Sequence, residues 1–211
     1  PRANAAMAVL LSESGYPQAA VGFSDKSVEL GALPESTREL RRLAMYCMAR
    51  QPPAPDVMNA LKANLGQVAD VSSNEAVQLF AELVADRGCD ERSTRQFGDM
   101  IYERFVSGAH LTPTVLASMA KVENVLGNYA RAMDYAEALA SLRPRDATAT
   151  MMVMYFAWQT NDVERIQRSL ERLSRLKCEH MLDAEQLDVF RQFATAAEAR
   201  SAALRPSLAC P

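Results

Sequence analysis

Residues 126–146 read LGNYARAMDYAEALASLRPRD, a helical run with a break on either side. Gly127 stops the preceding helix, and the run that follows it is rich in alanine, leucine and methionine, which favour helix. Pro144 ends the run because proline cannot continue a helix interior. Asp146 is a good N-cap for the next helix. The stretch is therefore typical of the second arm of a helical hairpin that another hairpin follows directly.

Similar breaks recur at near-regular intervals along the rest of the chain. One helix is expected over 3–14, up to the stop at Gly15. A second is expected from Pro17 to the stop at Gly31, with proline in the first turn and glycine after the last. No segment alternates apolar and polar residues as a half-buried strand does. The same signals predict further helices that start near Ser36, Asp56, Ser72, Asp90, Thr112, Tyr129, Asp146, Asp162 and Asp183.

The expected helices form pairs that begin near residues 2, 36, 72, 112 and 147, which gives units of about 34 to 40 residues, within the range of helical repeats. A single hairpin cannot bury the apolar stripes of both its helices, so neighbouring hairpins must stack. The sequence predicts an all-α fold, an α-solenoid of about five antiparallel hairpins with a C-terminal capping helix. It forms one domain over 1–204, followed by a tail at 205–211.

Residues 113–146 resemble a tetratricopeptide repeat, which has small residues where its two helices approach, a turn between them and a terminal proline. The positions that carry the resemblance are Ala120, Gly127, Tyr129, Ala132 and Pro144. Residues 1–34 and 147–180 are weaker copies, and 35–112 matches poorly. The resemblance implies a right-handed solenoid whose concave groove binds peptides or partner proteins.

In that family the outgoing helix of each pair lines the concave wall. The resemblance therefore places two sets of residues in the groove: Thr114, Ala117, Lys121 and Asn124 in one repeat, and Met151, Tyr155, Trp158 and Gln159 in the next. The two aromatic rings beside a methionine suit an extended peptide or an amphipathic helix. The spacing of Met151, Tyr155 and Trp158 fits a core stripe equally well.

Arginines recur at spacings of three, four and three residues between 165 and 175, at Arg165, Arg168, Arg172 and Arg175. Such a stripe could meet an acidic partner or an anionic membrane surface. The interleaved Glu164 and Glu171 instead favour a solvated, ion-paired helix face. We take the second interpretation as the default.

No enzyme motif is present in the sequence, neither G-x-S-x-G, nor a phosphate-cradling glycine loop, nor H-E-x-x-H. His110 and His180 each lack a second ligand at helical spacing, so no metal is expected. The carboxylates Asp99 and Glu103 lie one turn apart, but Arg95 and Arg104 are near enough in sequence to pair with them. We expect neither catalysis nor a cofactor.

The four cysteines are Cys47, Cys89, Cys178 and Cys210, widely spaced and without a C-x-x-C pair. Buried, inert thiols are the default interpretation, because free cysteine is commonly interior. A bridge between Cys178 and Cys210 remains an alternative if the chain lives in an oxidising compartment.

Hydrophobic residues make up 49% of the 211-residue chain and charged residues 23%, which is enough to build a packed interior. A formal charge of −3 offers no overall attraction to phosphate backbones, so nucleic acid is not an expected partner. The longest apolar run, 151–158, is far shorter than the roughly 20 residues that span a bilayer. The start at Pro1 fits a piece of a longer protein, whose flanks could hold a signal peptide or a membrane anchor.

The predicted function is a non-catalytic scaffold for a protein or peptide partner, a soluble part of a larger assembly such as a bacterial envelope secretion or polysaccharide machine. Its compartment, cytoplasmic or periplasmic, stays open. The alternative is the helical scaffold lobe of an envelope glycan-processing enzyme. Such an enzyme needs a glutamate in the cleft of a separate compact lobe, and the sequence indicates no such lobe.

Overall fold

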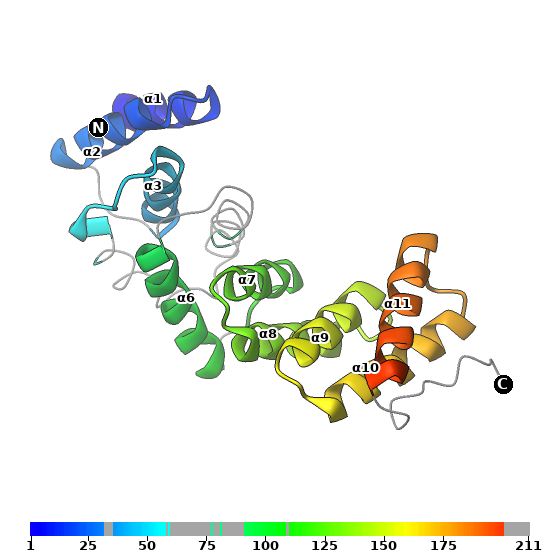
Figure 1. The fold of residues 1–211 in the computed structure, drawn as a ribbon. Helices are drawn as coiled ribbons and strands as arrows, with labels where there is room; N and C mark the ends of the chain where they lie inside the picture. Colours follow the sequence, from blue (N-terminus) through cyan, green and yellow to red (C-terminus); the bar gives the residue numbers. More distant parts are fainter. Residues whose placement is uncertain are drawn as a thin grey trace. The chain divides into compact units, whose positions relative to one another are not determined.

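The computed structural model describes residues 1–31, 36–57, 59, 77, 81, 91–108 and 110–200. Within these ranges all regular elements are α-helices, as the sequence predicts (Figure 1). They are α1 (Arg2–Glu13), α2 (Pro17–Glu29), α3 (Ser36–Ala49), α6 (Glu91–Val106), α7 (Pro113–Val125), α8 (Tyr129–Leu142), α9 (Ala147–Gln159), α10 (Val163–Cys178) and α11 (Ala184–Arg200). Of the helix expected from Ser72 only Val77 and Ala81 are described, both in helical conformation, and the tail at 205–211 lies outside the described residues. No described helix is long and apolar enough to cross a membrane.

Several helices end where the sequence predicts because the chain takes a left-handed residue there. Gly15 and Gly127 have φ of +82° and +72°, which glycine adopts without a steric penalty. Asn161 stands 34 residues after Gly127 and has the same kind of conformation, with φ of +58°. Asparagine is one of the few other residues that tolerate it. The turn before α10 therefore repeats the turn before α8 with a different residue.

Side-chain caps fix the starts of four helices. At three of them an N-cap oxygen accepts a hydrogen bond from the backbone N–H three residues later. The fourth is a capping box, in which an aspartate and a glutamine each accept from the other's backbone N–H. The pairs are Thr112 with Val115 N (3.3 Å), Asp146 with Ala149 N (3.2 Å), Asp162 with Arg165 N (3.0 Å), and Asp183 with Gln186 (2.8 and 3.2 Å).

The chain divides into two compact units, residues 1–126 and 127–211. In the first unit α2 packs against both α1 and α3, and α6 packs against α7. Most of the buried residues are apolar, and the fully buried ones include Ala20, Leu43, Phe97, Ile101, Val115 and Met119.

One buried cation joins α2 to α3 in the first unit. Arg42 is 3% exposed; its guanidinium donates to Asp25 (2.7 Å), Glu39 (2.8 Å) and Asp56 (3.2 Å), and the hydroxyl of Tyr46 donates to Asp25 (2.6 Å). Burial by itself lowers the pKa of Arg42, but the bond to Asp25 and the charges of the other carboxylates outweigh it and raise the pKa. Burial, and then the bond to Asp25, raise the pKa of Tyr46. The arginine therefore stays charged in the interior.

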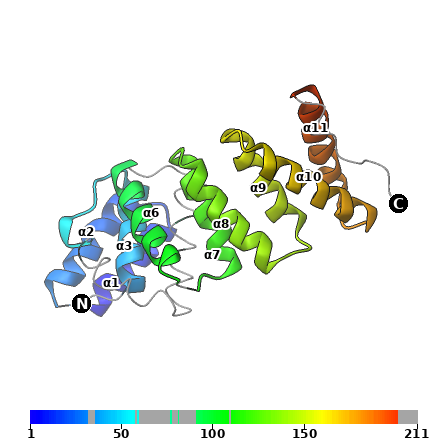
Figure 2. The same ribbon diagram turned by 90° about the horizontal axis from the view of Figure 1, so that it is seen from below.

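In the second unit α9 lies between its neighbours (Figures 1 and 2). It packs against α8, α10 and α11, and it contains no charged residue. Figure 2 shows α8, α9, α10 and α11 following one another along the unit. The buried side chains come from all four helices and include Tyr135, Met154, Phe156, Ile166, Leu173 and Phe190.

Two cysteines differ from the sequence prediction. Cys47 on α3 and Cys178 at the end of α10 are both disulfide-bonded, so their interpretation as inert thiols is wrong. Cys89 and Cys210 lie outside the described residues. A disulfide depends on two Cα atoms within about 7 Å, and spacing along the sequence does not report that distance.

We predict that Arg42→Met destabilises the first unit by about 3 kcal/mol, because it removes the cation that faces the buried Glu39 carboxylate. Urea unfolding followed by far-ultraviolet circular dichroism measures the loss. Lys26→Ala is the matched control, since it breaks an exposed ion pair with Glu29 and should change stability by less than about 0.5 kcal/mol. Equal, small losses for both variants would contradict a structural role for the Arg42 cluster.

Candidate functional site

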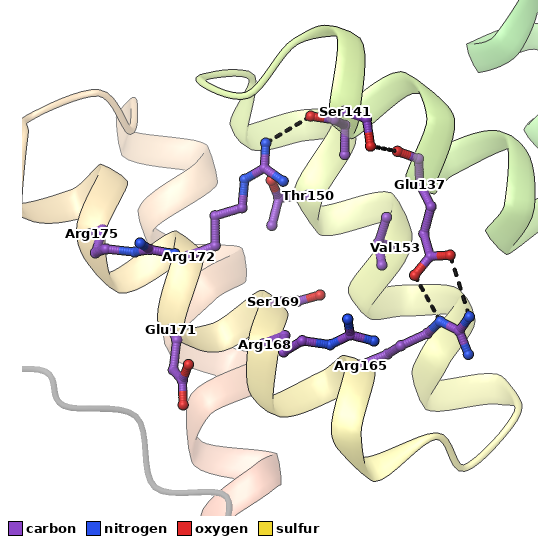
Figure 3. A pocket seen from close by; sticks show the side chains of 11 residues that line it. Glu137, Ser141, Thr150, Val153, Arg165, Arg168, Ser169, Glu171, Arg172 and Arg175 are labelled. Atoms are coloured by element: carbon purple, nitrogen blue, oxygen red, sulfur yellow. Dashed lines mark hydrogen bonds and ion pairs between the residues drawn. The ribbon is translucent and has the colours of Figure 1, made fainter.

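A pocket of about 550 Å³ opens in the second unit where α10 crosses α8 and α9 (Figure 3). Its walls carry the whole predicted arginine stripe. The lining residues are Glu137, Ala140 and Ser141 from α8, Thr150 and Val153 from α9, and Arg165, Arg168, Ser169, Glu171, Arg172 and Arg175 from α10.

The arginines share one face of α10 because their spacing follows the helical period. The opposite face is apolar, and Ile166, Leu170 and Leu173 on it are almost fully buried. Burial of that apolar face holds α10 against α9. The arginines on the other face of α10 therefore line the pocket. Within the described residues, two of the arginines are held by hydrogen bonds to the protein, and two are not.

Arg165 is held by two carboxylates. Its Nε and Nη2 donate to the two oxygens of Glu137 on α8, at 2.7 and 3.3 Å, and its Nη1 donates to Asp162 at 2.6 Å. The bonds to Glu137, and then to Asp162, raise the pKa of Arg165. In turn the Arg165 guanidinium, followed by the Arg165 backbone N–H, lowers the pKa of Asp162. Arg165 thus forms a fixed wall that links α10 to α8.

Arg172 is held by backbone carbonyls. Its Nη2 donates to the carbonyl oxygens of Ala140 and Pro144, both at 2.8 Å. The carbonyls of a helix's last turn have no partner within the helix, so a cation there stabilises its C-terminus. Arg172 therefore caps α8 and forms the second fixed wall.

Arg168 and Arg175 remain available. The nearest carboxylate to Arg168 is Glu164 at 3.9 Å, and the Arg168 side chain is 60% exposed. Arg175 is exposed and forms no ion pair within the part of the chain that the structure describes. In Figure 3 the Arg168 side chain extends beside Ser169 toward Arg165 and Val153. Its guanidinium can reach a bound group without breaking a strong contact.

A second hollow of about 360 Å³ adjoins the pocket and shares Ala140, Ser141, Arg172 and Arg175 with it. Arg145 and Glu179 contribute its other charges, and Pro144 and Leu176 contribute apolar surface. The two hollows together are called the arginine groove below. It is long enough to involve the ends of α8 and α10 as well as the middle of α10.

The residues that the family resemblance places in a groove occupy a different surface. On α9, Tyr155 (37% exposed) and Gln159 are exposed, while Met151 and Trp158 are half-buried. The Trp158 ring meets Phe193 of α11 edge-on, with centroids 6.1 Å apart. None of the four belongs to the buried face of α9, which is formed by Ala147, Ala149, Thr150, Val153, Met154, Phe156 and Ala157.

The other predicted residues lie on α7, in the first unit. Thr114 and Lys121 are exposed, and Asn124 is half-buried. The structure therefore gathers the predicted α9 residues on one helix face, and it places the α7 residues on a helix of the other unit.

Among the described residues there is no group of three or more histidine, cysteine, aspartate or glutamate side chains that could hold a metal ion. Neither a protein-family model nor a curated protein matches the chain.

We predict that Asp162→Asn lowers stability at about pH 7 and that this difference disappears in acid. Asparagine keeps the capping oxygen but loses the charge that Arg165 binds. Because the pKa of Asp162 is lower in the folded chain, its contribution is present above the unfolded pKa of about 4 and is lost as pH falls through the folded pKa. Urea unfolding of both proteins at about pH 7, 5 and 3 tests this.

Asp188→Asn serves as the control, because Asp188 is 68% exposed. It should show little difference from the wild type at any of these pH values. A deficit for Asp162→Asn that stayed constant down to about pH 3 would rule out the charged contact as its cause.

Proposed function

We propose that this chain is a non-catalytic interaction scaffold, a tetratricopeptide-like α-solenoid that holds a partner protein or peptide. Several features support the solenoid. Each hairpin helix in the second unit packs on its neighbours in sequence, and α9 also contacts α11, the next outgoing helix. The turns at Gly127 and Asn161 share a left-handed residue 34 residues apart, the period of this repeat class.

The binding proposal rests on the exposed side chains of one face of α9, called the outer face of α9 below. Tyr155 and Gln159 are exposed there beside the half-buried Met151 and Trp158, on a helix that has no charge to attract solvent. Aromatic side chains supply much of the energy of protein interfaces, because they bury a large area at a small entropy cost. We assign this face to the partner. Thr114, Lys121 and Asn124 of α7, which the family resemblance also assigns to partner binding, belong to the first unit and are proposed as partner contacts of that unit.

The disulfide bonds at Cys47 and Cys178 support a location of the chain outside the reducing cytosol. Cys47 and Cys178 are both oxidised in the fold, and stable disulfides are rare where glutathione and thioredoxin keep thiols reduced. The disulfides favour an oxidising compartment such as the bacterial periplasm. That compartment fits a role within an envelope secretion or polysaccharide assembly. Identifying the partner there tests this role directly.

We predict that a photoreactive benzoylphenylalanine at Tyr155 crosslinks the partner in cells, and that the same group at Met181 does not. The two positions are similarly exposed, at 37% and 40%, so they differ in place rather than in accessibility. Tyr155→Ala combined with Gln159→Ala should then weaken binding of the crosslinked partner about tenfold, with helicity unchanged. Equal crosslinking from both sites, or full binding by the double variant, would remove α9 from the interface.

We also predict that Cys47 and Cys178 resist alkylation in protein that is acid-trapped at lysis, and that they react only after reduction. Peptide mapping by mass spectrometry before and after reduction identifies the bonded partners. Reduction should lower the free energy of unfolding by about 2 kcal/mol or more, because the cross-links restrict the unfolded chain. Complete alkylation of both thiols without reductant would place the working protein in a reducing compartment.

A further inference from the structure

We propose that the arginine groove binds an acidic peptide segment of a partner protein, with Arg168 and Arg175 as the residues that grip its carboxylates. This site is separate from the outer face of α9, and it does not depend on the function assigned to that face.

The groove combines fixed and available cations. Arg165 and Arg172 are immobilised by Glu137 and by the last carbonyls of α8, so they keep the pocket open and shaped. Arg168 and Arg175 keep free hydrogen-bonding capacity on the same face of α10. A guanidinium can bind a carboxylate through two parallel hydrogen bonds, which makes arginine well suited to this recognition. A ligand would bind a surface whose shape is already fixed. Only the Arg168 and Arg175 side chains would become ordered on binding.

The charge of the pocket selects an anion. Four arginines and two glutamates line it, which leaves a net charge of about +2 in a chain whose formal charge is −3. Local charge in a concave surface attracts the opposite charge more strongly than the same charge spread over an open face. One of the glutamates, Glu137, is already occupied by Arg165. The unbalanced positive charge therefore lies among Arg168, Arg172 and Arg175, which share the one remaining carboxylate of the lining, Glu171.

The shape favours a peptide over other anions. Two hollows share Arg172 and Arg175 and continue along α10, so the groove fits an extended chain rather than a single small ion. Val153 in one hollow and Leu176 in the other contribute small apolar areas to the lining, which suits a segment that mixes acidic and apolar residues. A flat membrane surface can meet the exposed Arg168 and Arg175 but cannot enter the hollows beside them. Nucleic acid is disfavoured by the overall negative charge.

The test uses a fluorescein-labelled peptide, EELEEL, and its neutral counterpart, QQLQQL, in fluorescence anisotropy with the full chain. We expect the acidic peptide alone to bind, with an affinity that falls as salt rises. The double variant Arg168→Gln, Arg175→Gln should bind it about five- to thirtyfold more weakly. Arg191→Gln is the control, because Arg191 is an exposed arginine of α11 outside the groove, and it should bind normally.

A second measurement needs no variant. Phenylglyoxal modifies accessible arginines, and mass spectrometry locates the products. EELEEL should protect Arg168 and Arg175 in the wild type and leave Arg191 reactive. The proposal is overturned if QQLQQL binds or protects equally, or if the double variant keeps full affinity. It is also overturned if phosphatidylglycerol vesicles or inorganic phosphate protect these arginines and EELEEL does not.

Discussion

The fold of the second unit depends on the burial of the apolar surface of α9. This helix contains no charged side chain, and most of its surface is apolar, so exposing it to water would cost more than any single polar contact in the unit returns. Three helices provide the cover, since α8, α10 and α11 all pack against α9. Their amphipathic character follows from this role, because each turns one apolar face to α9 and its polar residues outward. The positions of the surface groups are set by that packing.

The arginine groove is a consequence of the same packing. Covering α9 brings α10 beside α8, which is 21 residues earlier in sequence when counted from Leu142 to Val163. The residues beneath the groove, Thr150 and Val153, belong to α9 and are small. The space above them is therefore lined by long side chains from α8 and α10, and the pair Glu137 and Arg165 joins the two helices across it. The groove exists because small residues on the buried face of α9 lie between the polar faces of α8 and α10.

Local sequence signals predicted the helices well. They could not predict contacts between residues that are far apart in the sequence. The stops at Gly15 and Gly127 and the caps at Asp146 and Asp162 are decided within a few residues, so the sequence reports them directly. The contact of Arg165 with Glu137 joins residues 28 positions apart, and the Arg42 cluster joins α2 to α3 in a similar way. When the arrangement of the helices is unknown, an arginine stripe is interpreted as an ordinary solvated helix face. For the same reason the sequence did not predict the bonded state of Cys47, and it offered a bridge at Cys178 only as an alternative.

The different roles of the four arginines follow from helix geometry. Arg165 and Arg172 are seven residues apart, and so are Arg168 and Arg175, which makes each pair nearly superimposed along the axis. The two pairs are offset by three residues, or about 60° around the helix. The first pair lies on the edge of the stripe that faces α8, where Glu137 and the helix carbonyls hold it. The second pair also lines the pocket but lies about 60° farther around α10, and among the described residues neither Arg168 nor Arg175 donates a hydrogen bond to α8. A stripe that looks uniform in sequence is divided into a structural half and a binding half by its rotation against one neighbouring helix.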